Sequence, residues 1–92
     1  MDKSKSEYHD TISRIAARAR KLAIEKGQHY EPITIVMDLQ SAHEHIGLDL
    51  NGLLTADDAD FEHDVFGIRQ HMDRNSFPGK LIGKFKPRYA SQ

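Results

Sequence analysis

The chain has 92 residues, a mass of 10.5 kDa and a net charge of −1, which suits one small domain over residues 1–92. With 38% hydrophobic and 29% charged residues, its composition is that of a globular protein and not of a disordered one. Cysteine is absent and no apolar run is long enough to cross a bilayer. The sequence therefore argues against a disulfide-bonded secreted protein and a membrane protein, and we expect a cytoplasmic one.

The charged residues form three blocks along the chain. Residues 1–30 hold seven basic and four acidic side chains. Residues 31–73 hold one basic and ten acidic side chains, and residues 74–92 hold five basic and no acidic ones. The acidic middle would repel a phosphate backbone, which argues against a uniformly basic nucleic-acid-binding protein. Two simple structural interpretations remain open: the basic C-terminal residues fold back onto the acidic middle, or the blocks are solvated faces.

A first amphipathic helix is predicted over about residues 7–26, where apolar residues recur at spacings of three and four. These residues are Tyr8, Ile12, Ile15, Ala16, Ala19, Leu22 and Ala23. Ser6 is the expected N-cap, and Gly27 stands where a left-handed residue ends a helix. Arg18 falls on the polar side, where we expect it to be solvated.

A second helix is predicted over about residues 32–46, because Pro32 is tolerated at a first helical position and Gly47 can end the helix. The β-branched run at residues 33–36 favours a strand instead, but the polar residues that follow show no strand alternation. The expected buried side chains are Ile35, Leu39, Ala42 and Ile46. We therefore favour a helix.

A short turn capped by Asp49 then leads to a third helix over about residues 57–73. The segment from Thr55 to Asp58 resembles a capping box with aspartate as its distal acid. The apolar face of this helix comprises Phe61, Val65, Ile68 and Met72.

Beyond a predicted turn at residues 77–80, basic and apolar residues alternate with a period of two over about residues 80–90. This pattern predicts an extended segment, one strand or a short hairpin, which Pro87 limits to a sheet edge. The expected fold class is mainly α: a three-helix domain with a short connecting turn and an extended C-terminal segment, with or without β pairing.

The strongest functional candidate is a group of acids at the start of the third helix. They are Asp57, Asp58, Asp60, Glu62 and Asp64. Asp60 and Asp64 lie one turn apart and are expected off the apolar face, pointing to solvent. An acidic face of this kind imitates the charge of nucleic acid and attracts a basic groove on a partner.

A second candidate is the basic tail, in which cations alternate with aromatic residues. Its candidate nucleic-acid-binding residues are Lys80, Lys84, Lys86 and Arg88. Phe85 or Tyr89 would stack on the bases of a single strand. The same apolar residues can instead pack on the core, an interpretation that we favour.

The third candidate is a small metal-dependent enzyme that uses His43, His63 and Asp64. Six histidines invite this hypothesis, but the helical His-Glu-x-x-His spacing is missing and there is no cysteine. A structural role, in which His63 packs or pairs locally, is favoured. We therefore expect no metal ion, no cofactor and no enzymatic activity.

A set of residues over about 33–90, densest over 56–74, matches a known pattern. It comprises Met37-Asp38-Leu39, His43, Leu48-Asp49-Leu50, Leu53-Leu54, Ala56-Asp57-Asp58, Phe61, His63-Asp64-Val65-Phe66-Gly67-Ile68, His71, Asp73-Arg74, Gly79-Lys80-Leu81 and Phe85-Lys86-Pro87-Arg88-Tyr89-Ala90. Here the sequence resembles a family of short phage and prophage proteins of unknown function. The resemblance implies a phage gene expressed in a bacterial cytoplasm. It also implies a small accessory protein that binds a host protein or nucleoprotein complex, defence complexes included, and modulates or inhibits it. The resemblance implies no mechanism.

Overall fold

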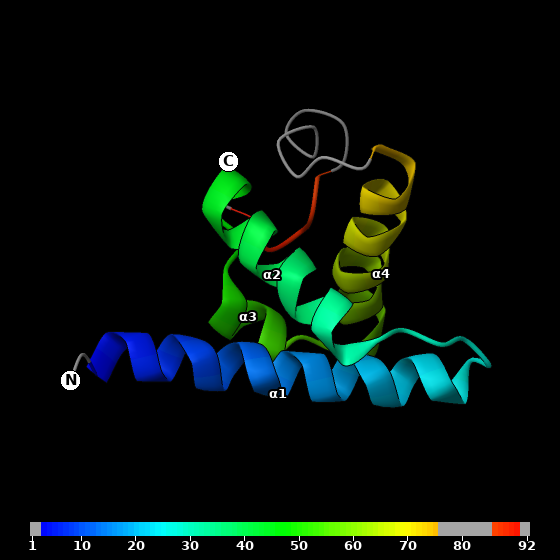
Figure 1. Ribbon diagram of the computed structural model, residues 1–92, viewed down its shortest axis with the longest axis horizontal. Coiled ribbons are helices and arrows are strands. Elements are labelled where there is room, and N and C mark those ends of the chain that lie inside the picture. The colour runs from blue at the N-terminus through cyan, green and yellow to red at the C-terminus, as the bar shows by residue number, and fades with distance from the viewer. Residues whose placement is uncertain (1–2, 76–85, 91–92) are drawn as a thin grey trace.

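Four helices make up most of the computed structural model, which describes residues 3–75 and 86–90 of the chain. They are α1 (Lys3–Glu25), α2 (Pro32–Ile46), α3 (Leu50–Leu54) and α4 (Asp58–Asn75). Helix α1 runs along one side of the molecule, and α2 and α4 rise from it (Figure 1). The described residues contain no strand, so the predicted mainly α class is confirmed, with the predicted connecting turn forming the short helix α3.

The core lies where the apolar faces of these helices meet, and the predicted faces are confirmed. In α1 the side chains of Ile12, Ile15, Ala16, Ala19 and Ala23 are buried, and Tyr8 and Leu22 pack at the edge of the core. The four predicted residues of α2 and the four of α4 are all buried. Burial of these side chains removes apolar surface from water, which is the main force that holds the helices together.

The predicted helix ends are partly confirmed. Gly27 and Gly47 have φ angles of 75° and 66°, the left-handed conformation that glycine adopts without strain. Helix α1 begins at Lys3, so the prediction of Ser6 as its N-cap is wrong. No glycine or proline interrupts residues 3–7, and the helix extends through them by a further turn.

The caps of α3 and α4 come from aspartate. The Asp49 carboxylate accepts a hydrogen bond from the Gly52 N–H at 3.1 Å, as predicted. At α4 the Asp57 carboxylate accepts from the Asp60 N–H at 2.9 Å, which makes Asp57 the capping residue. The predicted capping box is therefore wrong, because Thr55 stands at the C-terminal end of α3 and its hydroxyl donates back to the Asn51 carbonyl of that helix.

Arg18 joins α1 to the other helices, and the expectation that it is solvated is wrong. Its guanidinium donates to the Leu54 carbonyl at 2.9 Å and to the Asp58 carboxylate at 2.8 Å. The same group lies over the Phe61 ring, 4.2 Å from its centroid, where the ring quadrupole attracts a cation. A second ion pair, Asp38 with Arg69 at 3.2 Å, joins α2 to α4.

The end of the predicted extended segment packs against the helices. The structure describes its residues 86–90, whereas residues 80–85 and the predicted turn at 77–80 lie outside the described residues. Pro87 is buried, Leu48 and Ala90 form an isolated antiparallel bridge, and the Asp49 N–H donates to the Tyr89 carbonyl. These contacts hold the C-terminal segment beside the connection between α2 and α3.

Candidate functional site

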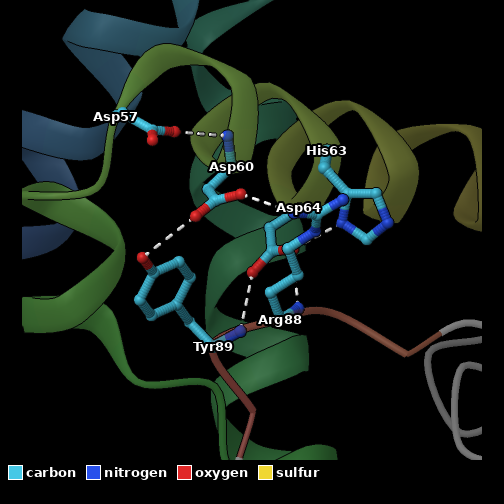
Figure 2. Close-up of polar contacts among 6 residues, drawn as sticks. All are labelled: Asp57, Asp60, His63, Asp64, Arg88 and Tyr89. Carbon is cyan, nitrogen blue, oxygen red and sulfur yellow. Dashed lines mark hydrogen bonds and ion pairs between the residues drawn. The ribbon is translucent and has the colours of Figure 1, made fainter.

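Three of the five predicted acids form a polar cluster with the C-terminal segment (Figure 2). The cluster consists of Asp57, Asp60, His63, Asp64, Arg88 and Tyr89, and we call it the tail anchor. Its acids come from Asp57 and the first two turns of α4, and the hydrogen-bond donors that reach them from the C-terminal segment belong to residues 88–89. Residues that the sequence separates by more than 20 positions therefore meet at one place.

Asp64 lies at the centre of the tail anchor and is 0% exposed. One carboxylate oxygen accepts the N–H of Arg88 at 2.8 Å, and the other accepts the N–H of Tyr89 at 2.9 Å. The first oxygen also lies 2.8 Å from Nδ1 of His63, which donates because an ionised carboxylate can only accept. The expectation that Asp64 points to solvent is wrong, since this side chain binds the backbone of the C-terminal segment.

Asp60 holds the side chains of the same two tail residues. Its carboxylate pairs with the Arg88 guanidinium at 2.7 Å and accepts the Tyr89 hydroxyl at 3.4 Å. The Asp60 side chain is 27% exposed, so the expectation of a solvent-facing carboxylate is also wrong here. Arg88 covers part of Asp60, and the interpretation that basic C-terminal residues fold back onto the acidic middle is correct for this residue.

The remaining predicted acids lie nearer the surface. Asp57 is exposed and caps α4, and the Asp58 side chain is 71% exposed although it pairs with Arg18 at 2.8 Å. Glu62 is half-buried and pairs with Lys26 of the α1–α2 connection at 3.1 Å. The structure thus brings the five acids to one end of α4 but leaves only Asp57 and Asp58 well exposed to a partner.

The residues of the basic-tail candidate that the structure describes differ in their contacts and exposure. Arg88 is paired with Asp60 and Tyr89 is half-buried beside α4, whereas Lys86 is exposed. Lys80 and Lys84 lie outside the described residues. In the described part of the tail, Arg88 and the ring of Tyr89 therefore make intramolecular contacts, whereas Lys86 faces solvent.

The histidines of the metal hypothesis lie on different helices. Nδ1 of His43 lies 3.0 Å from the Leu48 carbonyl oxygen, and Nδ1 of His63 contacts Asp64. Over residues 3–75 and 86–90, no three His, Asp or Glu side chains come together as a set that could hold a metal ion. The same residues include no helix that is long and apolar enough to span a bilayer.

The contacts that Arg18 and Tyr89 make with the acids at the start of α4 were not predicted from the sequence. For Arg18 a signal existed, because it lies three residues after Ile15 and four before Leu22, at the edge of the apolar face of α1. For Tyr89 the alternation predicted only that one side of the tail packs on the core. Its hydroxyl partner on α4 could not be read from that pattern.

Tyr89 also makes the stability of the fold depend on alkaline pH. Partial burial raises the pKa of Tyr89 above the ordinary 10.0, and the neighbouring Asp60 carboxylate raises it further. Because the folded pKa exceeds the unfolded one, the neutral phenol contributes stability below pH ~10 that is lost as the pH rises through the folded pKa. We expect Tyr89→Phe to remove this part of the alkaline stability loss, measured by urea unfolding across the pH range.

Ultraviolet titration of phenolate provides a direct check on this prediction. The chain has three tyrosines, and the difference between the titration curves of the wild type and Tyr89→Phe isolates one of them. A midpoint at or below pH ~10 for that difference would contradict the expected shift.

The chain belongs to a family of unknown function, DUF6874, whose model matches residues 7–91. The match includes most of α1, so it extends further toward the N-terminus than the resemblance expected over about residues 33–90. Neither the search of curated proteins nor the search of solved structures gave a match to the chain.

Proposed function

We propose that this member of a family of unknown function is a non-catalytic protein that binds a basic macromolecular partner through its acidic surface. We define this acidic surface as Asp57, Asp58, Asp60 and Glu62, at the N-terminal end of α4. Asp64 does not belong to it, because its buried carboxylate holds the C-terminal segment. The observation that supports the proposal best is the exposure of the adjacent carboxylates of Asp57 and Asp58.

The charge balance around the acidic surface supports attraction of a basic partner. Residues 49–64 carry six carboxylates, and three basic side chains from elsewhere in the described residues pair with them: Arg18, Lys26 and Arg88. The positive end of a helix dipole offsets only about half a charge. Among the described residues these acids therefore outnumber the basic side chains that pair with them, and such a surplus of negative charge steers a basic surface toward the site.

The proposal extends to a setting and a kind of partner. The resemblance to short phage and prophage proteins supports a phage- or prophage-encoded protein that acts in the bacterial cytoplasm. The partner is then a host protein or nucleoprotein complex whose basic groove normally meets nucleic acid. The chain would inhibit or modulate that partner by occupying the groove.

A double substitution, Asp57→Asn with Asp58→Asn, tests the acidic surface. Asparagine caps a helix about as well as aspartate, so the fold should lose less than ~1 kcal/mol while two negative charges disappear. We expect host proteins captured by the tagged wild-type chain from bacterial lysate to be lost from the variant. Quantitative mass spectrometry of the retained proteins measures this loss. Association rates with a captured partner should fall as salt is added, because screening shortens to about 8 Å at physiological ionic strength.

The control removes the same charge from α1, through Asp10→Asn with Glu25→Gln. Both side chains are exposed and lie outside the acidic surface. Equal losses in the two variants would point to net charge alone and contradict a specific surface. Loss of binding in a Lys84→Glu, Lys86→Glu variant only, with retention of single-stranded nucleic acid by the wild type, would favour the basic tail instead.

A further inference from the structure

A groove of about 300 Å³ opens between the N-terminal part of α1, the end of α2 and the start of α3. Its lining residues are Glu7, Tyr8, Thr11, His43, Leu48, Asp49, Leu50 and Asn51. None of them belongs to the acidic surface or to the tail anchor. The volume is at the lower end of the range for small-ligand sites, which is roughly 300–1,000 Å³.

One wall of the groove is aromatic. The rings of Tyr8 and His43 lie 5.2 Å apart between centroids, tilted by 47°. Nδ1 of His43 lies 3.0 Å from the Leu48 carbonyl oxygen, and a carbonyl oxygen can only accept, so Nδ1 carries the proton. In the neutral imidazole this leaves Nε2 as a hydrogen-bond acceptor.

The groove is also rich in negative charge and in acceptors. Its lining includes the exposed carboxylates of Glu7 and Asp49. One Asp49 oxygen accepts the Gly52 N–H, which fixes the orientation of the carboxylate at the start of α3. Burial raises the pKa of Tyr8, and the nearby Glu44 carboxylate raises it further, so the phenol stays neutral over the physiological range.

We propose that this groove binds an organic cation, an alkylguanidinium or alkylammonium of the size of an arginine or lysine side chain. The cation lies against the Tyr8 ring, where the π face attracts positive charge, and its N–H groups donate to Glu7 and Asp49. The same carboxylates repel an anion. The proposal does not depend on the acidic surface of α4, because the two sites share no residue.

The test is a titration of the full-length protein followed by ¹H–¹⁵N NMR. Nα-acetylarginine amide represents the side chain of a partner protein, and agmatine represents a free amine. Saturable shifts at Tyr8, His43, Asp49 and Asn51 with either compound support the site, and the tighter binder identifies the source of the cation. Nα-acetylcitrulline amide has nearly the same shape without the charge, and we expect it to bind at least about tenfold more weakly.

A matched pair of variants locates the binding. Glu7→Gln with Asp49→Asn should weaken binding of the arginine compound by about tenfold or more, while the asparagine retains the cap on Gly52. Asp57→Asn with Asp58→Asn makes the same change in net charge on α4 and should leave the affinity nearly unchanged. Equal binding of the citrulline compound, equal weakening in both variants, or absence of saturable shifts with both cations would each overturn the proposal.

Discussion

Replacement of Asp64 by alanine is expected to lower the free energy of unfolding by about 3–5 kcal/mol. The carboxylate is fully buried and accepts the N–H groups of Arg88 and Tyr89. Without it, both donors and the His63 ring lose a charged acceptor, and each such hydrogen bond contributes ~1.5–3 kcal/mol. The loss is a large share of the ~5–15 kcal/mol that stabilises a typical domain. Urea unfolding measures it.

Two further variants separate the role of Asp64 from a general effect of charge. Asp64→Asn keeps one acceptor oxygen, so its free energy of unfolding should lie between those of the wild type and the alanine variant. Hydrogen exchange should be faster than in the wild type at the amide of Arg88 or Tyr89. Asp10→Ala removes an exposed acid of α1 that pairs with Arg14 across one helical turn, and should cost less than ~0.5 kcal/mol. A loss below ~1 kcal/mol in Asp64→Ala, with unchanged exchange at both amides, would contradict the tail anchor.

The helical spacing of α4 could have predicted the burial of Asp64 but not the partners of its carboxylate. Asp64 lies three residues after Phe61 and four before Ile68, so its position falls at the edge of the buried face of α4. The spacing could therefore have predicted burial, although the charge of aspartate pointed to solvent. The partners of the carboxylate are backbone N–H groups 24 and 25 residues away, and no local pattern encodes that contact.

The helices themselves were more predictable because their determinants are local. The faces of α1, α2 and α4 follow from apolar spacing, and the ends at Gly27 and Gly47 follow from the freedom of glycine at positive φ. The N-cap predicted for α4, Thr55, lies two residues before the observed N-cap, Asp57. Thr55, Asp57 and Asp58 are all residue types that favour N-cap positions, and the choice among them depends on how α3 ends.

Long-range ion pairs account for most of what the sequence did not reveal about the site. Arg18 and Asp58 are 40 residues apart, and Arg88 and Asp60 are 28 apart. Both arginines come from outside the acidic middle, and their contacts offset part of its negative charge. A count of charges along the chain therefore overstates the negative charge that a partner would contact. Of the five predicted acids, only Asp57 and Asp58 are well exposed, although Asp58 pairs with Arg18, and these two residues are thus a narrower target for mutagenesis than the full set.

Ile68→Ala is expected to lower the free energy of unfolding by about 2–5 kcal/mol. Ile68 lies on the buried face of α4 and is 1% exposed, in contact with a core to which all four helices contribute. Truncation removes buried methyl and methylene groups and leaves a cavity that close-packed neighbours fill only in part. The midpoint of urea unfolding should fall with little change in its slope, because the surface exposed on unfolding stays nearly the same.

The same substitution at Ile33 is the matched control for Ile68→Ala. Ile33 lies in the first turn of α2 and is 69% exposed, so Ile33→Ala removes the same atoms from a side chain that mostly contacts water. We expect a change within ~0.5 kcal/mol there, since alanine also favours the helical conformation over isoleucine. If Ile68→Ala cost less than ~0.5 kcal/mol, or no more than Ile33→Ala, the buried face assigned to α4 would be wrong. A large loss at Ile68 alone would show that this face, and not helical propensity, holds α4 in place.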